Sequence, residues 1–276
     1  MDSEPLLRLA AFFGVLGLLA TWETLAPRRQ VTAAKLRRWA TNVGIVVLNT
    51  IMLRALFATG AVGVAAVATY ERWGLLNHLA WPTFLETLLA VIALDFVLYL
   101  QHVMFHAVPG LWRFHMMHHA DLDCDVTTGV RFHPIEVTLS LVIKLTAIVV
   151  LGASPAAVLC FEILLNATSM FNHSNVWIPV PLDRVLRWCV VTPDMHRIHH
   201  SIDPRETNRN FGFNLPWWDR LLGTYLPNPA QEHETMTLGL AQFRDPTRLN
   251  LLGILALPFV GELGKYPLGR ENPNGS

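Results

Sequence analysis

The chain has 276 residues, of which 52% are hydrophobic and only 15% charged, and its mean hydropathy is +0.36. Soluble domains carry about a quarter charged residues, so this composition favours a membrane protein. Lys and Arg total 21, as do Asp and Glu, so net charge gives no argument for a polyanionic partner and no nucleic acid is expected.

The first apolar segment, Leu6 to Trp22, resembles a secretory signal in length alone. Asp2 and Glu4 precede it where a signal peptide carries basic residues, and no small-residue cleavage site follows it. We therefore expect a retained membrane helix, with a signal peptide as the alternative interpretation.

Five apolar stretches approach or reach the length of about 20 residues that a membrane-spanning helix requires. They are 5–22, 41–69, 83–105, 135–152 and 154–173. A further stretch, 250–260, has about half that length and predicts an interfacial or packed helix. The predicted fold is therefore all-α: a multi-pass membrane bundle of four to five spanning helices with a cytoplasmic helical cap.

Basic residues predict the orientation of this bundle, because connections rich in Lys and Arg stay in the cytoplasm. The second connection (70–82) contains only Arg72, whereas the first is crowded with basic side chains. Those of the first connection are Arg28, Arg29, Lys35, Arg37 and Arg38. We expect this connection to face the cytoplasm, with the N-terminus outside and every histidine-rich segment on the cytoplasmic side. The expected location is a bacterial inner membrane.

Two charges lie within the apolar stretches 135–152 and 154–173. Lys144 and Glu162 are each nine residues from the turn at Ala153, which places them at similar depth. Charges inside a bilayer are costly and usually paired, so we expect these two side chains to face each other. Arg54 is the competing partner for Glu162.

Four tryptophans beyond the last apolar stretch either anchor a cap at the level of the lipid headgroups or pack in its core. They are Trp177, Trp188, Trp217 and Trp218. The three cysteines, Cys124, Cys160 and Cys189, cannot all pair within one chain and show no zinc-binding spacing. We expect reduced structural thiols, with Cys160 acting as a small hydrophobic residue.

Histidine is the most informative residue of this chain, because nine of its twelve histidines recur in spaced groups. These nine are His102, His106, His115, His118, His119, His173, His196, His199 and His200. Residues three or four apart on a helix share a face, so HxxxH at 102–106 offers two nitrogens in one direction. HxxHH occurs twice, at 115–119 and 196–200, and each copy can serve one metal or bridge the space between two.

Imidazole is the commonest metal ligand among side chains, and nine imidazoles exceed what one ion can take. The pattern therefore predicts two metals if the groups converge. Histidines at membrane interfaces can also cap helices, bind phosphates or be solvated. That interpretation suits His78 and His233, which lie outside the motifs and receive no role.

Several segments together resemble the fatty acid hydroxylase and sterol desaturase superfamily of integral-membrane di-iron oxygenases. The matching text is DFVLYLQHVMFH (95–106), LWRFHMMHH (111–119), RFHPIE (131–136), FNHSN (171–175), DMHRIHH (194–200) and NFGFNLPWWDRLLGTY (210–225). The resemblance covers 83–226, the expected catalytic region. Residues 1–82 are expected to form N-terminal membrane helices and 227–276 a C-terminal tail with a short interfacial helix.

The resemblance implies two irons held by the nine histidines, with dioxygen as co-substrate and the metal centre itself as the catalyst. It implies removal of hydrogen from an unactivated C–H bond of a lipid, which gives an alcohol or, after a second abstraction, an alkene. Neutral imidazoles suit Fe(II) and do not by themselves distinguish iron from zinc. The expected partners are the bilayer, a lipid substrate such as an acyl chain or sterol, and a separate ferredoxin- or cytochrome-type electron donor.

Some family members bring a tenth histidine near the third group, and none stands at the neighbouring positions here, so water or Asn172 is expected to complete one metal. Glu136 is expected to accept a hydrogen bond from a ligand. His133 precedes Pro134, which ends any helix there, and is expected to support the ligands, with direct ligation as the alternative. Asp95 is expected to orient a ligand or to pair with Arg54, and a buried polar contact unrelated to metal is equally open.

Two further expectations concern the remainder of the matching region. Asp219 and Arg220 are expected to form an ion pair or to cap a helix. The methionines either line a lipid tunnel or pack between helices. They are Met104, Met116, Met117 and Met170.

An alternative function of another class is a non-enzymatic membrane metal protein, either a metal transporter or a haem carrier. Transport would place ionisable ligands along the middle of the membrane path, whereas these histidines gather at helix ends. Haem bound by two histidines would leave seven without a role. The sequence leaves hydroxylation and desaturation equally open.

Overall fold

The computed structural model describes residues 4–31, 34–260 and 262–269, and within these ranges the regular structure is entirely helical. The long helices are α1 (Glu4–Leu25), α2 (Lys35–Leu56), α3 (Ala61–Tyr70), α4 (Thr83–Ala107), α6 (Pro134–Leu151) and α7 (Pro155–His173). The shorter ones are η1 (Leu75–His78), α5 (Pro109–His119), η2 (Thr128–Val130), α8 (Val180–Leu186), α9 (Pro193–His199), α10 (Pro204–Thr207), α11 (Trp217–Leu221) and α12 (Leu251–Val260).

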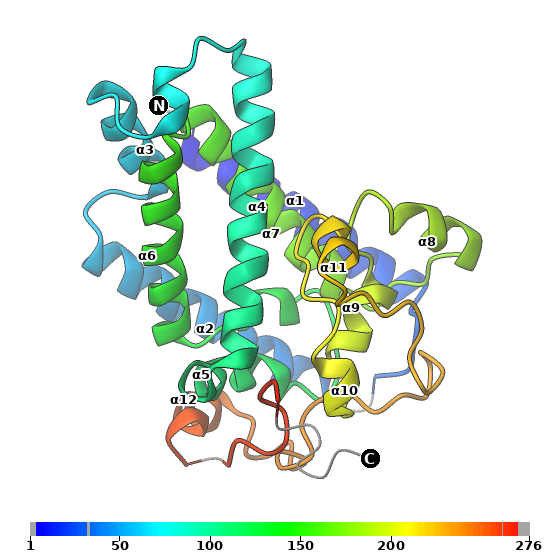
Figure 1. Cartoon of the computed structure of the whole chain (residues 1–276). Coiled ribbons are helices and arrows are strands. Elements are labelled where there is room, and N and C mark those ends of the chain that lie inside the picture. The colour runs from blue at the N-terminus through cyan, green and yellow to red at the C-terminus, as the bar shows by residue number, and fades with distance from the viewer. Residues whose placement is uncertain (1–3, 32–33, 261, 270–276) are drawn as a thin grey trace.

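Five segments are long and apolar enough to cross a membrane, as the sequence predicts. They are Glu4–Leu25, Lys35–His78, Thr83–Ala107, Pro134–Leu151 and Pro155–His173. In the bundle that they form, α4 packs against α6 and α7, α1 packs on α7, and α2 packs on α6 (Figure 1). The connection between α3 and α4 lies at one end of this bundle, and α5, α10 and α12 lie at the other.

The second apolar stretch does not form a single helix, which corrects the sequence expectation for 41–69. It begins earlier, at Lys35, and is interrupted between Leu56 and Ala61. Phe57 adopts an extended conformation with φ −121° and ψ 112°, and Gly60 is also extended before α3 begins. Gly has a low helix propensity and gives the chain an inexpensive place to bend.

The tight hairpin between α6 and α7 depends on Gly152. This residue has φ +70°, and a Cβ at its position would lie 2.6 Å from the Trp73 carbonyl oxygen. Ser154 then caps α7 by accepting a hydrogen bond from the Ala157 N–H, and Pro155 occupies the first helical turn. The sharp turn brings α6 and α7 side by side.

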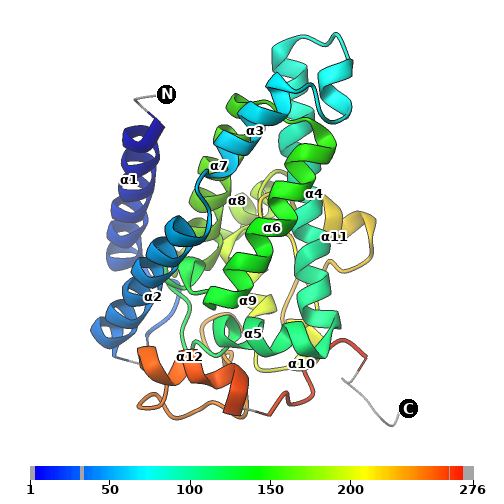
Figure 2. The same ribbon diagram turned by 90° about the vertical axis from the view of Figure 1, so that its left-hand side faces the viewer.

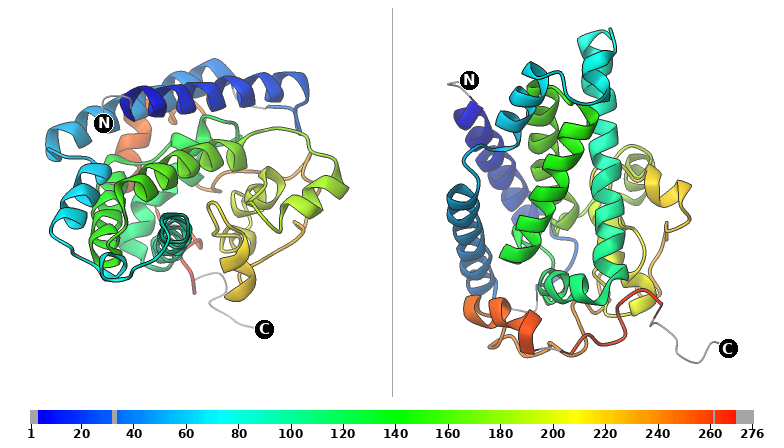
Figure 3. Two further views of the ribbon diagram at one scale, coloured as in Figure 1. Left: turned by 90° about the horizontal axis from the view of Figure 1, so that it is seen from above. Right: turned by 60° about the vertical axis from the view of Figure 1, so that its left-hand side comes forward.

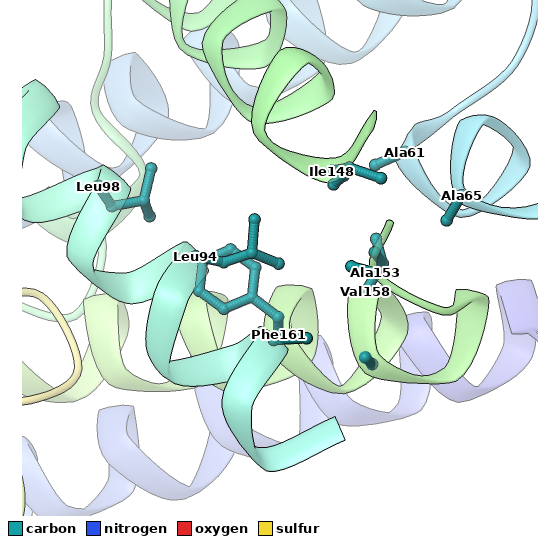
Figure 4. Close-up of a cluster of buried hydrophobic side chains, with 10 residues drawn as sticks. Ala61, Ala65, Leu94, Leu98, Ile148, Ala153, Val158 and Phe161 are labelled. Carbon is teal, nitrogen blue, oxygen red and sulfur yellow. The ribbon is translucent and has the colours of Figure 1, made fainter. Parts of the chain in front are cut away.

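A buried apolar cluster fills the half of the bundle next to this hairpin. It includes Leu94 and Leu98 of α4, Ile148 of α6 and Phe161 of α7, and small alanines of α3 close its edge (Figure 4). Because Ala61 and Ala65 are small, α3 approaches α6 and α7 closely. This cluster packs the spanning helices against one another in the half of the bundle away from the histidine-bearing helix ends.

Lys144 and Glu162 face each other and form an ion pair, which confirms the prediction made from their spacing. The competing partner named for Glu162 was wrong, because its second cation is Arg8 of α1, with Arg8 Nη2 2.7 Å from Glu162 Oε2. The sequence could not distinguish Arg8 from Arg54, since the contact depends on α1 packing against α7.

Outside the spanning helices, α12 lies across the end of the bundle (Figures 2 and 3). It packs against α5 and α2, with Ile254 and Leu257 buried and Leu252 and Phe259 exposed. The predicted short packed helix is therefore present.

Most of the tryptophans beyond the bundle, and two of the three cysteines, lie at the surface. Trp177, Trp188 and Trp217 are exposed, so core packing does not account for them, and a role at the headgroup level stays a prediction. All three cysteines are free thiols. Cys124 is buried, whereas Cys160 and Cys189 are exposed.

Candidate metal centre

Four segments bring the nine predicted histidines into one buried cluster at the end of the bundle. His102 and His106 occupy the last turns of α4, and His173 is the final residue of α7. The other six come from α5 and from α9 with the residue that follows it. Each of the nine has at most 2% of its surface exposed.

Local backbone signals place α5 and α9 where their histidines are needed. Val108 is extended before Pro109, as residues before proline tend to be, and Pro109 then opens α5. The chain therefore turns directly from the end of α4 into the helix that carries His115. In α9, Thr192 caps the N-terminus by accepting from the Met195 N–H, and Pro193 follows it.

The cluster divides into two groups, and within each group the ligating atoms lie within 4.8 Å of one another. The five-histidine group consists of His102, His106, His115, His119 and His199. The four-histidine group consists of His118, His173, His196 and His200. The groups are in contact, since the rings of His119 and His200 stack with centroids 4.6 Å apart.

The two HxxHH motifs are shared between the groups in a crossed pattern. His115 and His119 enter the five-histidine group while His118, between them, enters the other. The second motif does the reverse, because His196 and His200 enter the four-histidine group and His199 the five-histidine group. Adjacent histidines thus diverge, and each motif contributes to both groups.

The spacing of the ring nitrogens fits metal ions. His102 Nε2 and His115 Nε2 are 3.1 Å apart, and the same distance separates His173 Nε2 from His118 Nε2 and from His196 Nε2. Two nitrogens at about 2.1 Å from one ion and at right angles to each other would be about 3.0 Å apart. His106 Nε2, His199 Nε2 and both nitrogens of His200 are buried without a partner among the described residues. A metal in each group would satisfy such atoms.

The opposite ring nitrogen of six histidines is held by a hydrogen-bond acceptor. The Nδ1 acceptors are the Phe211 carbonyl for His102 (2.7 Å), Asn208 Oδ1 for His106 (3.1 Å), Glu136 Oε1 for His115 (2.6 Å), the Arg131 carbonyl for His118 (3.1 Å), the Ser169 carbonyl for His173 (2.7 Å) and the Arg209 carbonyl for His199 (2.8 Å). When Nδ1–H donates, Nε2 keeps its lone pair and points into the cluster. This is the usual arrangement around metal-binding histidines.

Burial and mutual repulsion keep these imidazoles neutral. The pKa values of His118, His119, His196 and His200 lie well below the ordinary value, because burial disfavours the charged ring and neighbouring histidines add to the effect. Burial likewise lowers the pKa of His199 to about 3. Neutral imidazole is the form that coordinates a cation, so the site is ready to bind metal at neutral pH.

Comparison with known proteins agrees with this geometry. A family model described as fatty acid hydroxylase matches residues 87–224, which is half of the chain. The chain belongs to the fatty acid hydroxylase family.

The relatives of this family member act on lipids according to their names. An ornithine lipid hydroxylase of Rhizobium tropici is 28% identical, with 94% of this chain and 78% of the relative covered. An alkylglycerol monooxygenase of Xenopus tropicalis is 30% identical over 60% of this chain, and a sphinganine C4-monooxygenase of Arabidopsis thaliana is 26% identical over 52%. The matched region spans about a third of the alkylglycerol monooxygenase, at 35%, and 55% of the sphinganine enzyme. No solved structure matches significantly.

An apolar cavity of about 580 Å³ leads from the metal centre of this fatty acid hydroxylase family member into the bundle. His102 and His115 line its inner end together with Phe105, Phe132 and Phe213. Its walls come from α1, α2, α4, α6 and α7, including Leu9 and Phe13 of α1 and Thr50 of α2. These last three side chains are also exposed at the surface, so the cavity opens sideways between α1 and α2.

Two residues expected to support the ligands lie elsewhere. His133 belongs to neither group: its Nδ1 accepts from the Ile135 N–H to cap α6, and its Nε2 lies 3.3 Å from the Leu255 carbonyl. Asp95 neither orients a histidine nor pairs with Arg54. Its carboxylate accepts from the N–H groups of Asn214 and Leu215 and from Trp218 Nε1, the third expectation stated for it. His133 thus caps α6 and contacts α12, whereas Asp95 holds a loop in place.

Other expectations have mixed outcomes. Asn172 is buried and donates to the Phe213 carbonyl, and its Oδ1 has no partner in the described part of the chain, so its role as a ligand stays a prediction. Arg220 does not pair with Asp219 but stacks over the rings of Trp188 and Tyr225. Met116, Met117 and Met170 are buried in apolar clusters, and neither they nor Met104 line the cavity.

Sequence reasoning missed the segment 208–211 as a support of the metal centre. Asn208, Arg209 and Phe211 each provide an acceptor for a histidine Nδ1. Two of these acceptors are backbone carbonyls, which carry no signature in a sequence. Asn208 alone could have been found, as a polar residue within the matching region.

Proposed function

We propose that this protein is an integral-membrane, dioxygen-dependent oxidoreductase that holds two iron ions and oxidises an unactivated C–H bond of a lipid. The observation that supports it most directly is the presence of two adjacent histidine groups together with an apolar cavity that reaches the five-histidine group from the membrane-spanning helices. Neither the described residues nor the comparisons favour the alternative of a metal transporter or a haem carrier.

The nine histidines would hold the metals, five in one group and four in the other. Iron bound there would activate dioxygen and supply the oxidant for C–H cleavage. The Nδ1 acceptors would keep the six rings that they bind in an orientation with Nε2 free to coordinate a metal. The four-histidine group offers one fewer nitrogen, so it is the group in which water or Asn172 would complete the ligand set. Zinc could occupy the same nitrogens, but a redox-inactive ion would not support this reaction.

Hydroxylation is the reaction that the relatives favour, since their names denote hydroxylases and monooxygenases. In it one oxygen atom enters the C–H bond and the other leaves as water, which consumes two electrons and two protons. These electrons must come from a donor outside the described residues, and a ferredoxin- or cytochrome-type protein is proposed. Desaturation would consume the same electrons and release two waters, and it is the second outcome to be tested.

The cavity positions the substrate. Phe105, Phe132 and Phe213 form an apolar surface beside His102 and His115, where a hydrocarbon chain can lie and water is excluded. The opening between α1 and α2 would admit the chain from the bilayer. The proposed substrate is therefore a membrane lipid, as the names of the relatives suggest.

The proposed arrangement in the cell follows the distribution of basic residues. Residues 83–226 would form the catalytic region, 1–82 the helices that wall the cavity, and 227–276 the tail that covers the metal centre. The basic connection between α1 and α2 would face the cytoplasm of a bacterial inner membrane, and the histidine groups with it.

Metal analysis of the purified protein and lipid profiling of cells with and without the gene test this proposal. We expect two irons per chain, and a lipid whose mass rises by one oxygen or falls by two hydrogens. His118→Ala and His199→Ala, one from each group, should abolish the lipid change, whereas His78→Ala, at an exposed position outside both groups, should leave it intact. One zinc without iron, or an unchanged lipid profile, would contradict the proposal.

A further inference from the structure

The far end of the cavity, on the side away from the metal centre, lies beside its opening at the exposed residue Leu9. On α6 its lining begins at Glu136, which binds His115, and ends at Lys144. Eight residues of helix separate the two, a rise of about 12 Å. On α4 the lining ends at Leu98, which belongs to the buried apolar cluster next to the α6–α7 hairpin. On α7 it ends at Leu165, which packs against that cluster.

Charged side chains meet at this far end. Lys144 contacts one carboxylate oxygen of Glu162, and Arg8 contacts the other at 2.7 Å. Glu4 in turn pairs with Arg8 at 2.9 Å, nearer the surface. Lys144 lines the cavity, and its side chain is only 15% exposed, so it is fixed between the cavity and the carboxylate behind it.

A hydrocarbon chain gains nothing from contact with such a group. Burying methylenes is favourable only against apolar surface, and covering an ammonium group with hydrocarbon removes its remaining polar contacts at a cost. Lys144 cannot easily move aside, because leaving Glu162 would separate two charges within the bundle. The chain of the lipid should therefore stop below Lys144.

We propose that Lys144, held by Glu162 and Arg8, sets how far a hydrocarbon chain can extend beyond the metal centre, and thereby selects lipids by chain length. This inference rests on the proposed function, because it assigns the cavity to the lipid that the metal centre oxidises. It makes Lys144 a specificity-determining residue that touches the substrate without taking part in the chemistry.

The test measures binding without turnover. Saturated fatty alcohols that differ by two methylenes are presented in lipid nanodiscs to the full-length protein, without an electron donor, and occupancy is measured by native mass spectrometry. For the wild-type protein we expect occupancy, compared at equal alcohol content of the nanodisc, to be maintained up to a fixed chain length and to fall beyond it. Lys144→Ala should move this limit to longer chains. Lys144→Arg keeps the charge and adds bulk, so it should move the limit to shorter chains.

Thr146→Ala is the matched control, because Thr146 lies on the same helix, is exposed and does not line the cavity. The longest alcohol that Thr146→Ala binds should be the same as for the wild type. The proposal is overturned if the limit is unchanged in Lys144→Arg and in any folded Lys144→Ala, or if Thr146→Ala moves it as well. Because the experiment requires no catalysis, its failure is distinct from a failure to find iron or an oxidised lipid.

Discussion

Glu136 connects the metal centre to the cavity wall. Its Oε1 accepts from His115 Nδ1 at 2.6 Å, and the same side chain lines the cavity. A carboxylate in this position fixes the tautomer of the ring and makes its other nitrogen a stronger donor to a metal. Glu136 would therefore support a metal at His115 without binding it directly.

Replacement of this carboxylate should weaken metal binding without unfolding the bundle. Glu136→Gln keeps an oxygen that can accept from His115 but removes the negative charge, so we expect iron affinity to fall by about 10-fold to 100-fold. Titration with a competing chelator measures this. Thr138→Val, on the same helix but outside the cavity lining, should retain wild-type affinity. Equal affinities for Glu136→Gln and the wild type would show that the contact does not support the metal.

At the residue scale, the sequence predicts which histidines converge far better than it predicts which groups accept hydrogen bonds from their Nδ1 atoms. Spacing on a helix brings His102 and His106 to one face, and it explains why adjacent histidines such as His118 and His119 diverge. It cannot find the carbonyls of Arg209 and Phe211, since any residue has one. For a related reason the sequence could not decide between the expectations stated for Asp95: it shares a helix face with His102, but its carboxylate binds a loop more than a hundred residues away.

At the scale of elements, the loop that supplies those carbonyls is itself held by Asp219. The carboxylate accepts from the N–H groups of Phe211 and Gly212, both at 2.8 Å, and from Thr224 Oγ1 at 2.7 Å. The Phe211 carbonyl in turn accepts from His102 Nδ1. The position of a metal-binding ring thus depends on a side chain at the start of α11.

Removing the Asp219 carboxylate should make the loop less stable and weaken metal binding at the same time. Asp219→Ala would leave two buried N–H groups unpaired, and each unpaired group costs about 1–3 kcal/mol. We expect a lower free energy of unfolding in detergent and a lower iron content after purification. Asp219→Asn, which keeps one acceptor oxygen, should lie between the alanine variant and the wild type. A wild-type iron content in Asp219→Ala would show that the loop does not support metal binding.

A second buried contact joins α2 to the loop after α5. Arg38 binds both carboxylate oxygens of Asp121, at 2.7 and 2.9 Å, and Asp125 at 2.8 Å. Burial by itself would raise the pKa of the Asp121 carboxyl, but the Arg38 guanidinium outweighs it and lowers this pKa from 3.8 to about 2. The contact therefore stabilises the fold above pH 3.8 and is lost as the pH falls toward 2, a change of about 2 kcal/mol.

Unfolding by urea at different pH values, on metal-free protein in detergent, checks this dependence. Asp121→Asn removes the titrating group, so its stability should be lower than wild type at neutral pH and should fall less steeply in acid. Parallel curves for the variant and the wild type would show that Asp121 does not carry the effect.

The helices themselves were largely predictable, because apolar length is a strong signal for a spanning segment. The break between Leu56 and Ala61 was missed, since the residues on both sides are apolar enough to continue one helix. The pairing of Lys144 with Glu162 followed from equal spacing around a turn. The role of Arg8 did not, because it depends on how two helices distant in sequence pack.

At the scale of the whole molecule, the bundle has two different ends. The connection between α3 and α4 lies at one end, and α5, α10 and α12 lie at the other (Figure 1). If the basic connection before α2 marks the cytoplasm, the residues around 71 are outside and those around 231 are inside.

Cysteine labelling in intact cells tests this orientation. In a background with Cys160 and Cys189 replaced by Ser, we would introduce Glu71→Cys or Gln231→Cys, both at exposed positions. A membrane-impermeant maleimide should label Glu71→Cys in intact cells and Gln231→Cys only after the membrane is opened. The reverse pattern would place the histidine groups outside the cell.

The crossed HxxHH motifs have a consequence for how the protein is made. Each group needs histidines from both 115–119 and 196–200, so neither can be completed while the second segment is still being synthesised. If the two groups hold metals as proposed, neither metal can be bound by all of its histidines until translation has passed residue 200.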